Sequence, residues 1–535
     1  MKKIIHYILI IGLFGTFSCA KRGTISGGLK DTIAPLLKVS IPENYSTDFK
    51  GQSIKITFDE YVKLKDINKS LIVSPPLAKK PQVLPLTASK TVTVNFLEPL
   101  QPNTTYSLNF GQSIQDHNEG NPYRQFKYVF STGPQIDSLT ITGNIKDALE
   151  KKADADISVM LYEANEKYND SLVYKNQPRY ITSIADTITS FKIDNIKEGK
   201  YHLIALKDRN GDYKFDPKTE KIGFYNRPIQ LPNDSLYELK LFKEIPAFKV
   251  FRPFQNSANS AVMGYEGNPK NIKLSLKKGN EIIEVIKTKI PKKDSLQLWF
   301  KPFKLEKNAV DSMQLSIQNG VYSKELTFKI KNQKTDTLLI SFPKKILDLS
   351  EMLSIPVNLP IAKIDESKMK LLNKDSLAVP FKVIYDEMEL QVKLDFKKEM
   401  LERYTLKIEP GAVTSYLEQV NNKQIVFSFE TKNTSDYGNL RIDIENVKRY
   451  PIILELTDKN GQVAYSYYCE KETQIDFNFI KPELYTLRII EDANKNGVWD
   501  SGNFLEKKQP ENVIYFPKDI DVRANWDVQQ SFILK

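Results

Sequence analysis

The sequence predicts an all-β protein built from tandem β-sandwich domains. Tyrosine and phenylalanine (26 and 28 residues) outnumber glycine and tryptophan (22 and 3), a composition that suits strands better than helices. Short runs alternate apolar and polar residues between proline, asparagine and glycine punctuation. A chain of 535 residues exceeds one hydrophobic core, and at roughly 150 residues per domain it predicts three to five domains.

The formal net charge of +11 does not indicate a nucleic-acid-binding protein. Lysines alternate with acidic residues along the whole chain, and no arginine cluster or aromatic-basic RNA signature is present. A solvated lysine-rich surface accounts for the charge, with a weak attraction to anionic lipid or glycan headgroups as the alternative.

Residues 1–18 have the layout of a secretory signal peptide. Lys2 and Lys3 precede an apolar stretch that is too short to span a membrane, and the stretch closes at Cys19. The small residue before Cys19 resembles a lipoprotein processing site, although Thr16 stands where leucine is usual. The resemblance implies acylation of Cys19, palmitate included, and anchoring in the outer membrane. Ordinary signal cleavage with a soluble product is the alternative.

Residues 19–34 contain three glycines and no strand pattern, so we expect a flexible tether. The N-terminus resembles that of Bacteroidota envelope lipoproteins, in which an acidic tract after the cysteine tends to mark surface export. Lys21 and Arg22 stand there instead. This favours the periplasmic face, with the cell surface as the alternative.

Residues 35–133 show the strand pattern of a sandwich. They resemble the bacterial Ig-like domain first described in S-layer proteins, a structural and adhesive module without catalytic residues. The resemblance is carried by six pieces in order: Ile56-Thr-Phe-Asp-Glu60, Ile72-Val-Ser-Pro-Pro76, Leu100-Gln-Pro-Asn-Thr-Thr-Tyr106, Ile114-Gln-Asp116, Gly120-Asn121 and Phe130-Ser-Thr132.

Residues 134–244 are again strand-rich. The turn Gly199-Lys-Tyr201 before a strand resembles the transthyretin-like or carboxypeptidase-regulatory sandwich. Residues 245–345 alternate in the same way, and we expect a β-sandwich of unclear type there.

The two remaining blocks repeat the first two, which predicts duplication. Residues 346–432 repeat the Ig-like block, since Phe429 follows Tyr404 by 25 residues as Phe130 follows Tyr106 by 24. In this alignment Asp116 corresponds to Thr414. Residues 433–535 repeat the transthyretin-like block, with Ile-Lys five residues before each tyrosine and an aspartate seven after it. The equivalent residues are Ile196, Lys197, Tyr201 and Asp208 in one copy, and Ile480, Lys481, Tyr485 and Asp492 in the other.

The duplicated acidic loop is the strongest candidate site. Both copies follow D-x-N-x-[D/N]-x-x-x-D, which places oxygen side chains where a calcium loop needs them. The twelfth-position glutamate of an EF-hand is missing, because Thr219 and Asn503 stand there. The alternative is a turn in which Asp and Asn hydrogen-bond the backbone. The candidate ligands are Asp208, Asn210, Asp212 and Asp216 in one copy, and Asp492, Asn494, Asn496 and Asp500 in the other.

The sequence gives no sign of catalysis. Outside the signal, only His117 and His202 could serve a Ser-His-Asp arrangement, and two histidines cannot supply most zinc sites. The neighbours Asp59 and Glu60 should point to opposite faces of a strand rather than act as a carboxylate pair. If Cys19 carries lipid, Cys469 has no disulfide partner and is a small strand residue.

We therefore expect a non-catalytic, lipid-anchored cell-envelope protein that scaffolds or binds through tandem sandwiches. A surface-exposed glycan-binding or adhesive lipoprotein is the alternative, and a hydrolase is a third reading. The expected partners are the membrane and envelope proteins or glycans. Calcium is the only cofactor that the sequence suggests.

Overall fold

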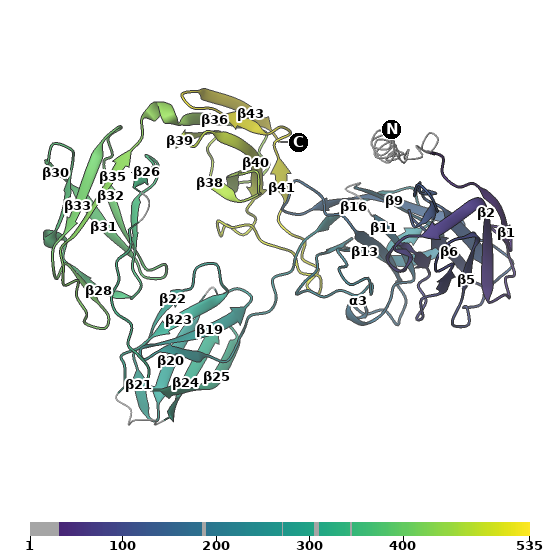
Figure 1. The fold of residues 1–535 in the computed structure, drawn as a ribbon, viewed down its shortest axis with the longest axis horizontal. Helices are drawn as coiled ribbons and strands as arrows, with labels where there is room; N and C mark the ends of the chain where they lie inside the picture. The colour runs from purple at the N-terminus through teal and green to yellow at the C-terminus, as the bar shows by residue number, and fades with distance from the viewer. Residues whose placement is uncertain (1–30, 185–188, 270, 304–309, 343–344, 535) are drawn as a thin grey trace, which may run out of the picture. The chain divides into compact units, whose positions relative to one another are not determined.

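The computed structural model describes residues 31–184, 189–269, 271–303, 310–342 and 345–534, and the fold is nearly all β (Figure 1). Cys19 and the signal peptide lie outside the described residues. The chain divides into two compact units. One runs to Thr140 and takes in residues 178–182 and 193–199; the other holds 141–177, 183–192 and 200–535. No helix in the described ranges is long and apolar enough to cross a membrane.

The first sandwich packs two sheets around an aromatic core. One sheet has the order β1-β2-β5-β4, with β7 also against β2, and the other is β3-β6-β8. In β2, Ile54, Ile56 and Phe58 are buried and Lys55 between them is exposed, which is the alternation that the sequence predicted. The elements are β1 Leu37–Ile41, β2 Ser53–Leu64, α2 Ile67–Ser70, β3 Ile72–Ser74, β4 Gln82–Leu84, β5 Ser89–Asn95, β6 Thr105–Asn109, β7 Ile114–Asp116 and β8 Lys127–Ser131.

The second sandwich has one sheet of order β11-β10-β13-β14, with β15 also against β13, and a smaller sheet β12-β9-β16. The pairing of β16 with β9 is parallel. The elements are β9 Leu139–Asp147, β10 Ile157–Glu163, α3 Leu172–Lys175, β11 Tyr180–Ile184, β12 Ser190–Ile196, β13 Gly199–Leu206, β14 Ile222–Phe224, β15 Ile229–Leu231 and β16 Leu236–Leu241.

The third sandwich joins a sheet β17-β19-β23-β22, with β18 also against β19, to a sheet β21-β20-β24-β25. Its core includes Met263, Leu298 and Met313. The strands are β17 Lys249–Val250, β18 Phe254–Ser257, β19 Ser260–Glu266, β20 Lys273–Lys278, β21 Glu281–Ile283, β22 Ile286–Lys289, β23 Ser295–Trp299, β24 Val310–Asn319 and β25 Tyr322–Lys331.

The fourth sandwich repeats the pairing of the first. Its sheets are β26-β35-β33-β29-β30, β27-β32-β31 and the two-stranded β28-β34. The elements are β26 Ile346–Leu347, β27 Leu353–Pro356, β28 Ile361–Ile364, η1 Glu366–Lys368, β29 Met369–Leu372, β30 Ala378–Val379, β31 Phe381–Asp386, β32 Gln391–Phe396, β33 Arg403–Ile408, β34 Val413–Ser415 and β35 Ile425–Thr431.

The fifth sandwich has the strand order of the second. Its sheets are β38-β37-β40-β41, with β42 also against β40, and β39-β36-β43, in which β43 again pairs parallel to the first strand. The elements are η2 Thr434–Asp436, β36 Gly438–Glu445, β37 Ile452–Thr457, β38 Val463–Cys469, β39 Gln474–Ile480, β40 Glu483–Glu491, β41 Val513–Tyr515, β42 Ile520–Val522 and β43 Asp527–Ile533.

Strand register supports the repeat and corrects one alignment. Tyr106 lies opposite Phe130, and Tyr404 lies opposite Phe429. Asp116, however, is the third residue of β7, and the third residue of β34 is Ser415, not Thr414. After the paired tyrosine, β33 runs one residue further than β6, so β34 begins nine residues after Tyr404 whereas β7 begins eight after Tyr106. Counting without a gap therefore misplaces the equivalent position by one.

Candidate functional site

The acidic loop of the second sandwich follows β13 and folds around one carboxylate. Asp208 Oδ1 accepts a hydrogen bond from the amide of Gly211 at 2.7 Å, and Oδ2 accepts one from Tyr213 at 2.9 Å. Asn210 and Asp212 each accept from the amide two residues further on, at 3.0 and 2.9 Å. These are the local bonds of a chain of Asx turns.

The loop of the fifth sandwich, after β40, is built in the same way. Asp492 is fully buried and accepts from the amides of Asn496 at 3.1 Å and Gly497 at 2.7 Å. The side-chain amides of Asn494 and Asn496 both donate to Asp500 Oδ2. The four predicted residues of each copy therefore do lie in one loop.

The sixth position has the same backbone conformation in both copies. Gly497 has φ of 76° and Tyr213 has φ of 59°, so both are left-handed. Glycine adopts this region freely, whereas tyrosine reaches it at a cost. The difference in residue type that separates the two loops in sequence therefore does not change their fold.

Each loop also contains a buried glutamate that sequence reasoning missed. Glu220 accepts from the amides of Arg209 and Asp216, both at 3.0 Å. Glu511 accepts from the equivalent amides of Ala493 at 2.8 Å and Asp500 at 3.0 Å. Burial raises the pKa of both carboxyls. The glutamates stand beyond the twelfth position that an EF-hand search inspects, and at different distances in the two copies, so a fixed spacing does not find them.

The side-chain oxygens of these loops fit turns better than a metal site. Those of Asp208 and Asp492 accept backbone N–H bonds, and no group of three or more His, Cys, Asp or Glu in the described ranges is placed to hold a metal ion. A Ca²⁺ ion takes six to eight oxygens. Calcium binding at these loops stays a prediction.

The residues considered for catalysis are held by packing and hydrogen bonds within the fold. The His202 ring stacks on Tyr168 at 3.8 Å, and burial lowers its pKa. His117 donates its amide to Tyr61 O at 2.9 Å, and Asp59 accepts from the amide of Leu36 at 2.8 Å. Cys469 is buried at the end of β38, and burial raises its thiol pKa to about 12.

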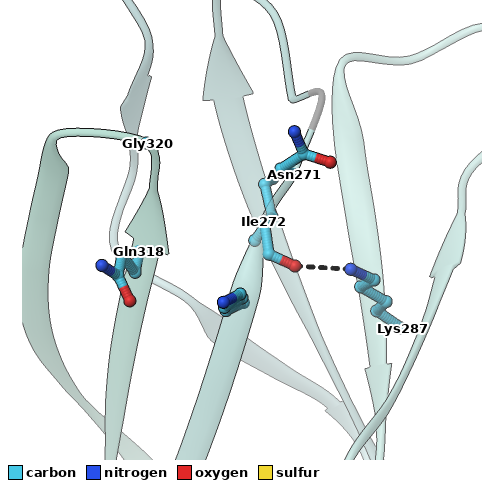
Figure 2. A pocket seen from close by; sticks show the side chains of 6 residues that line it. Asn271, Ile272, Lys287, Gln318 and Gly320 are labelled. Carbon is cyan, nitrogen blue, oxygen red and sulfur yellow. Dashed lines mark hydrogen bonds between the residues drawn. The ribbon is translucent and has the colours of Figure 1, made fainter.

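A hollow of about 590 Å³ opens on the third sandwich, where Lys287 donates to the carbonyl oxygen of Ile272 (Figure 2). Its charged lining residues are Lys273 and Lys287, and no carboxylate or histidine is among the described lining residues. The lining residues are Asn271, Ile272, Lys273, Lys287, Gln318 and Gly320.

The second and fifth sandwiches contact each other within the second compact unit. The Phe504 ring, 1% exposed, lies 5.3 Å from the Phe224 ring and 6.4 Å from the Tyr174 ring, centroid to centroid. The Phe504 amide donates to Glu244 Oε1 at 2.5 Å, and burial raises the pKa of that carboxyl.

Charged groups surround this apolar contact. Lys151 pairs with Asp519 at 2.9 Å, and Lys507 pairs with Asp170. The buried Arg488 donates to Glu455 Oε2 at 2.7 Å and to the carbonyl oxygen of Leu149 at 3.0 Å. A buried guanidinium needs such partners. Ion pairs and hydrogen bonds therefore join the second and fifth sandwiches at several points.

Two parts of the chain match known protein families. Residues 31–132 match the bacterial Ig-like domain family Big_5, and residues 148–241 match DUF2141, described as an uncharacterized protein conserved in bacteria. A comparison with curated proteins finds no match.

Solved structures similar to the chain include fragments of titin. The titin domains z1z2 in complex with telethonin share 13% identity over 36% of this chain and 98% of that chain, with a TM-score of 0.13. The titin fragment I67-I69 shares 10% identity over 54% of this chain and 99% of that chain, with a TM-score of 0.12. At these TM-scores the likeness supports no argument about this chain.

Proposed function

We propose that this chain is a non-catalytic, lipid-anchored protein of the cell envelope that acts as a scaffold or binding module through tandem sandwiches. One observation carries the proposal: the opening aspartates of the two acidic loops accept hydrogen bonds from the backbone of their own loops. Asp208 accepts from three amides of its own loop, and Asp492 accepts from two. Such bonds stabilise turns, which supports a framework role for these loops.

The anchor and the five-part layout belong to the proposal. The signal pattern before Cys19 supports acylation there, with residues 19–34 as a tether on the periplasmic side of the outer membrane. The strand orders shared by the second and fifth sandwiches support two transthyretin-like copies, and those shared by the first and fourth support two Ig-like copies. The Ig-like match supports a structural or adhesive role for the first domain.

An exposed strand edge offers a binding mode. β38 is an outer strand of its sheet, and five of its seven residues are exposed. An extended segment of an envelope protein could add to such an edge through main-chain hydrogen bonds.

A surface glycan-binding or adhesive role is the second candidate. It is favoured by Tyr467 and Tyr468, which lie on the same strand and are 37% and 40% exposed, and by Trp526, which is 56% exposed. Exposed aromatic rings provide rigid apolar surface with a polar handle.

Topology separates the two candidates. A protease added to intact cells should spare the protein if it is a periplasmic scaffold, and should digest it only after the outer membrane is opened. Digestion in intact cells would reject the scaffold reading in favour of the surface reading. A periplasmic protein digested only in opened cells serves as the control for membrane integrity.

A further inference from the structure

The loop that follows the acidic turn is longer in the fifth sandwich than in the second. The stretch from Asp492 to Glu511 is seven residues longer than the equivalent stretch from Asp208 to Glu220. Both glutamates bond the same two positions of their loops, so the ends of the stretch are equivalent. The extra length falls within residues 501–511, here named the latch segment.

The latch segment makes its bonds to the second sandwich. Ser501 Oγ donates to the carbonyl oxygen of Lys243 at 2.6 Å, and the Phe504 amide donates to Glu244. Gln509 Nε2 donates to the carbonyl oxygen of Phe224 at 2.9 Å and to Asn226 Oδ1 at 2.7 Å. The latch segment thus donates hydrogen bonds to both backbone and side-chain acceptors of the second sandwich.

An aromatic anchor stands at the centre of these bonds. Phe504 packs edge-on against Phe224, and the ammonium of Lys507 lies 4.0 Å from the centre of the Phe504 ring. A buried aromatic side chain surrounded by polar contacts is the usual arrangement of an interface hot spot.

A tight site inside the latch segment requires a glycine. A Cβ on Gly502 would lie 2.6 Å from a ring carbon of Phe242 and 2.7 Å from the carbonyl oxygen of Lys508. Any other residue would have to displace the Phe242 ring of the second sandwich or the latch segment's own backbone at Lys508. Sequence and geometry therefore agree on a close fit at this point.

We propose that the second sandwich carries a docking surface whose partner is the latch segment of the same chain. The docked segment holds together two repeats whose contact residues, Glu244 and Phe504, are 260 positions apart. The third and fourth sandwiches are then tethered at both ends. The second and fifth sandwiches consequently move as one body, a property that goes beyond the scaffold role proposed above.

A zero-length carbodiimide cross-link between Lys151 and Asp519 reports the docked state, because their ion pair belongs to this contact but lies outside the latch segment. The full chain should give this cross-link. Phe504→Ala should lower the ratio of docked to undocked chains by about tenfold or more, as expected for an aromatic anchor. Leu505→Ala, at a neighbouring side chain that is 58% exposed, should leave the ratio unchanged.

Exchanging the charges of Lys507 and Asp170 distinguishes loss of docking from loss of folding. Lys507→Asp should lower the cross-link because it faces Asp170, and adding Asp170→Lys should restore it. The Lys221–Asp147 cross-link inside the second sandwich should persist in every variant, which shows that this sandwich remains folded.

Three results would overturn the proposal. They are absence of the Lys151–Asp519 cross-link in the unaltered chain, its full retention in Phe504→Ala, and its formation between chains in a mixture of isotopically light and heavy protein. The last result would assign the latch segment to a second copy of the chain.

Discussion

The backbone amide of Phe504 donates a hydrogen bond to Glu244 Oε1 at 2.5 Å, and it joins two sandwiches that are separated by two others in sequence. Glu244 is almost fully buried, and burial, with Glu506 nearby, raises its pKa. Burial of Glu244 at this contact, opposed by the bond from Phe504, thus links the docking of the latch segment to the protonation of one carboxyl group.

Glu244→Gln should reduce the pH dependence of stability. Because the folded-state pKa of Glu244 is raised, its contribution to stability is present below the unfolded pKa and is lost as the pH rises through the folded value. Glutamine keeps an acceptor for the Phe504 amide without the charge. We expect the variant to melt higher than the unaltered chain at pH 7, and the difference to shrink toward pH 5. A difference in melting temperature that is constant between these pH values would contradict this account. His202, whose pKa is lowered, contributes equally to both proteins, so subtracting one melting temperature from the other removes its contribution.

Asp492→Ala should destabilise the fifth sandwich by about 1–2 kcal/mol, because the Gly497 amide loses its acceptor and the Asn496 amide keeps only Asn494 Oδ1. Exposed Asp234 provides a matched control, and its alanine variant should melt unchanged. If the loop is only a turn, a chelator leaves the melting temperature of the unaltered chain unchanged. A rise on adding Ca²⁺ that disappears in Asp492→Ala would establish the calcium site instead.

Tyr106→Phe and Tyr404→Phe should each cost about 1 kcal/mol. In the first and fourth sandwiches the phenol oxygen accepts a hydrogen bond from the backbone amide five residues earlier. Gln101 donates to Tyr106 at 2.9 Å, and Glu399 donates to Tyr404 at 2.8 Å. Each change strands one amide in its own sandwich, and thermal unfolding should show a drop of a few degrees. Tyr45→Phe, at a side chain that is 57% exposed, is the control. Unchanged melting of both variants would show that the paired bonds contribute nothing.

Cys469 should resist thiol reagents in the folded protein. Burial raises its pKa to about 12, and its Sγ donates to the carbonyl oxygen of Glu472 at 3.2 Å. The thiolate is the reactive species, so at pH 8 almost none is present. In a Cys19→Ala background, where it is the one cysteine, an aromatic disulfide reagent should react only after denaturant is added. Rapid reaction without denaturant would mean that β38 opens readily.

Local periodicity predicted the strands, because alternation reflects which face of one strand is buried. The run Ile54, Ile56 and Phe58 shows this directly. The acidic loops were also predictable, since Asx turns depend on residues a few positions apart. The spacing of the Asp and Asn residues is compatible with both a turn and a calcium site. It could not decide between them, because spacing does not reveal where the side-chain oxygens point.

Long-range features could not be predicted in this way. Glu220 and Glu511 follow the first aspartate of their loops, Asp208 and Asp492, by different numbers of residues, so no common spacing identifies them. In the sequence, Phe504 is an apolar residue in a polar loop, and nothing nearby indicates its role as an anchor. Its partners Glu244 and Phe224 are far away in sequence. The one-residue difference between Ser415 and Thr414 arose because β33 is one residue longer than β6, which only strand pairing reveals.

The proposed anchor is tested most directly by the intact mass and detergent partition of the membrane-expressed protein, beside Cys19→Ala. The account predicts cleavage before Cys19, a mass increment of two or three acyl chains, and partition into the detergent phase. The variant should lack both the increment and the partition. An unacylated, soluble product cut at another site would contradict the anchor and leave a secreted adhesin as the better reading.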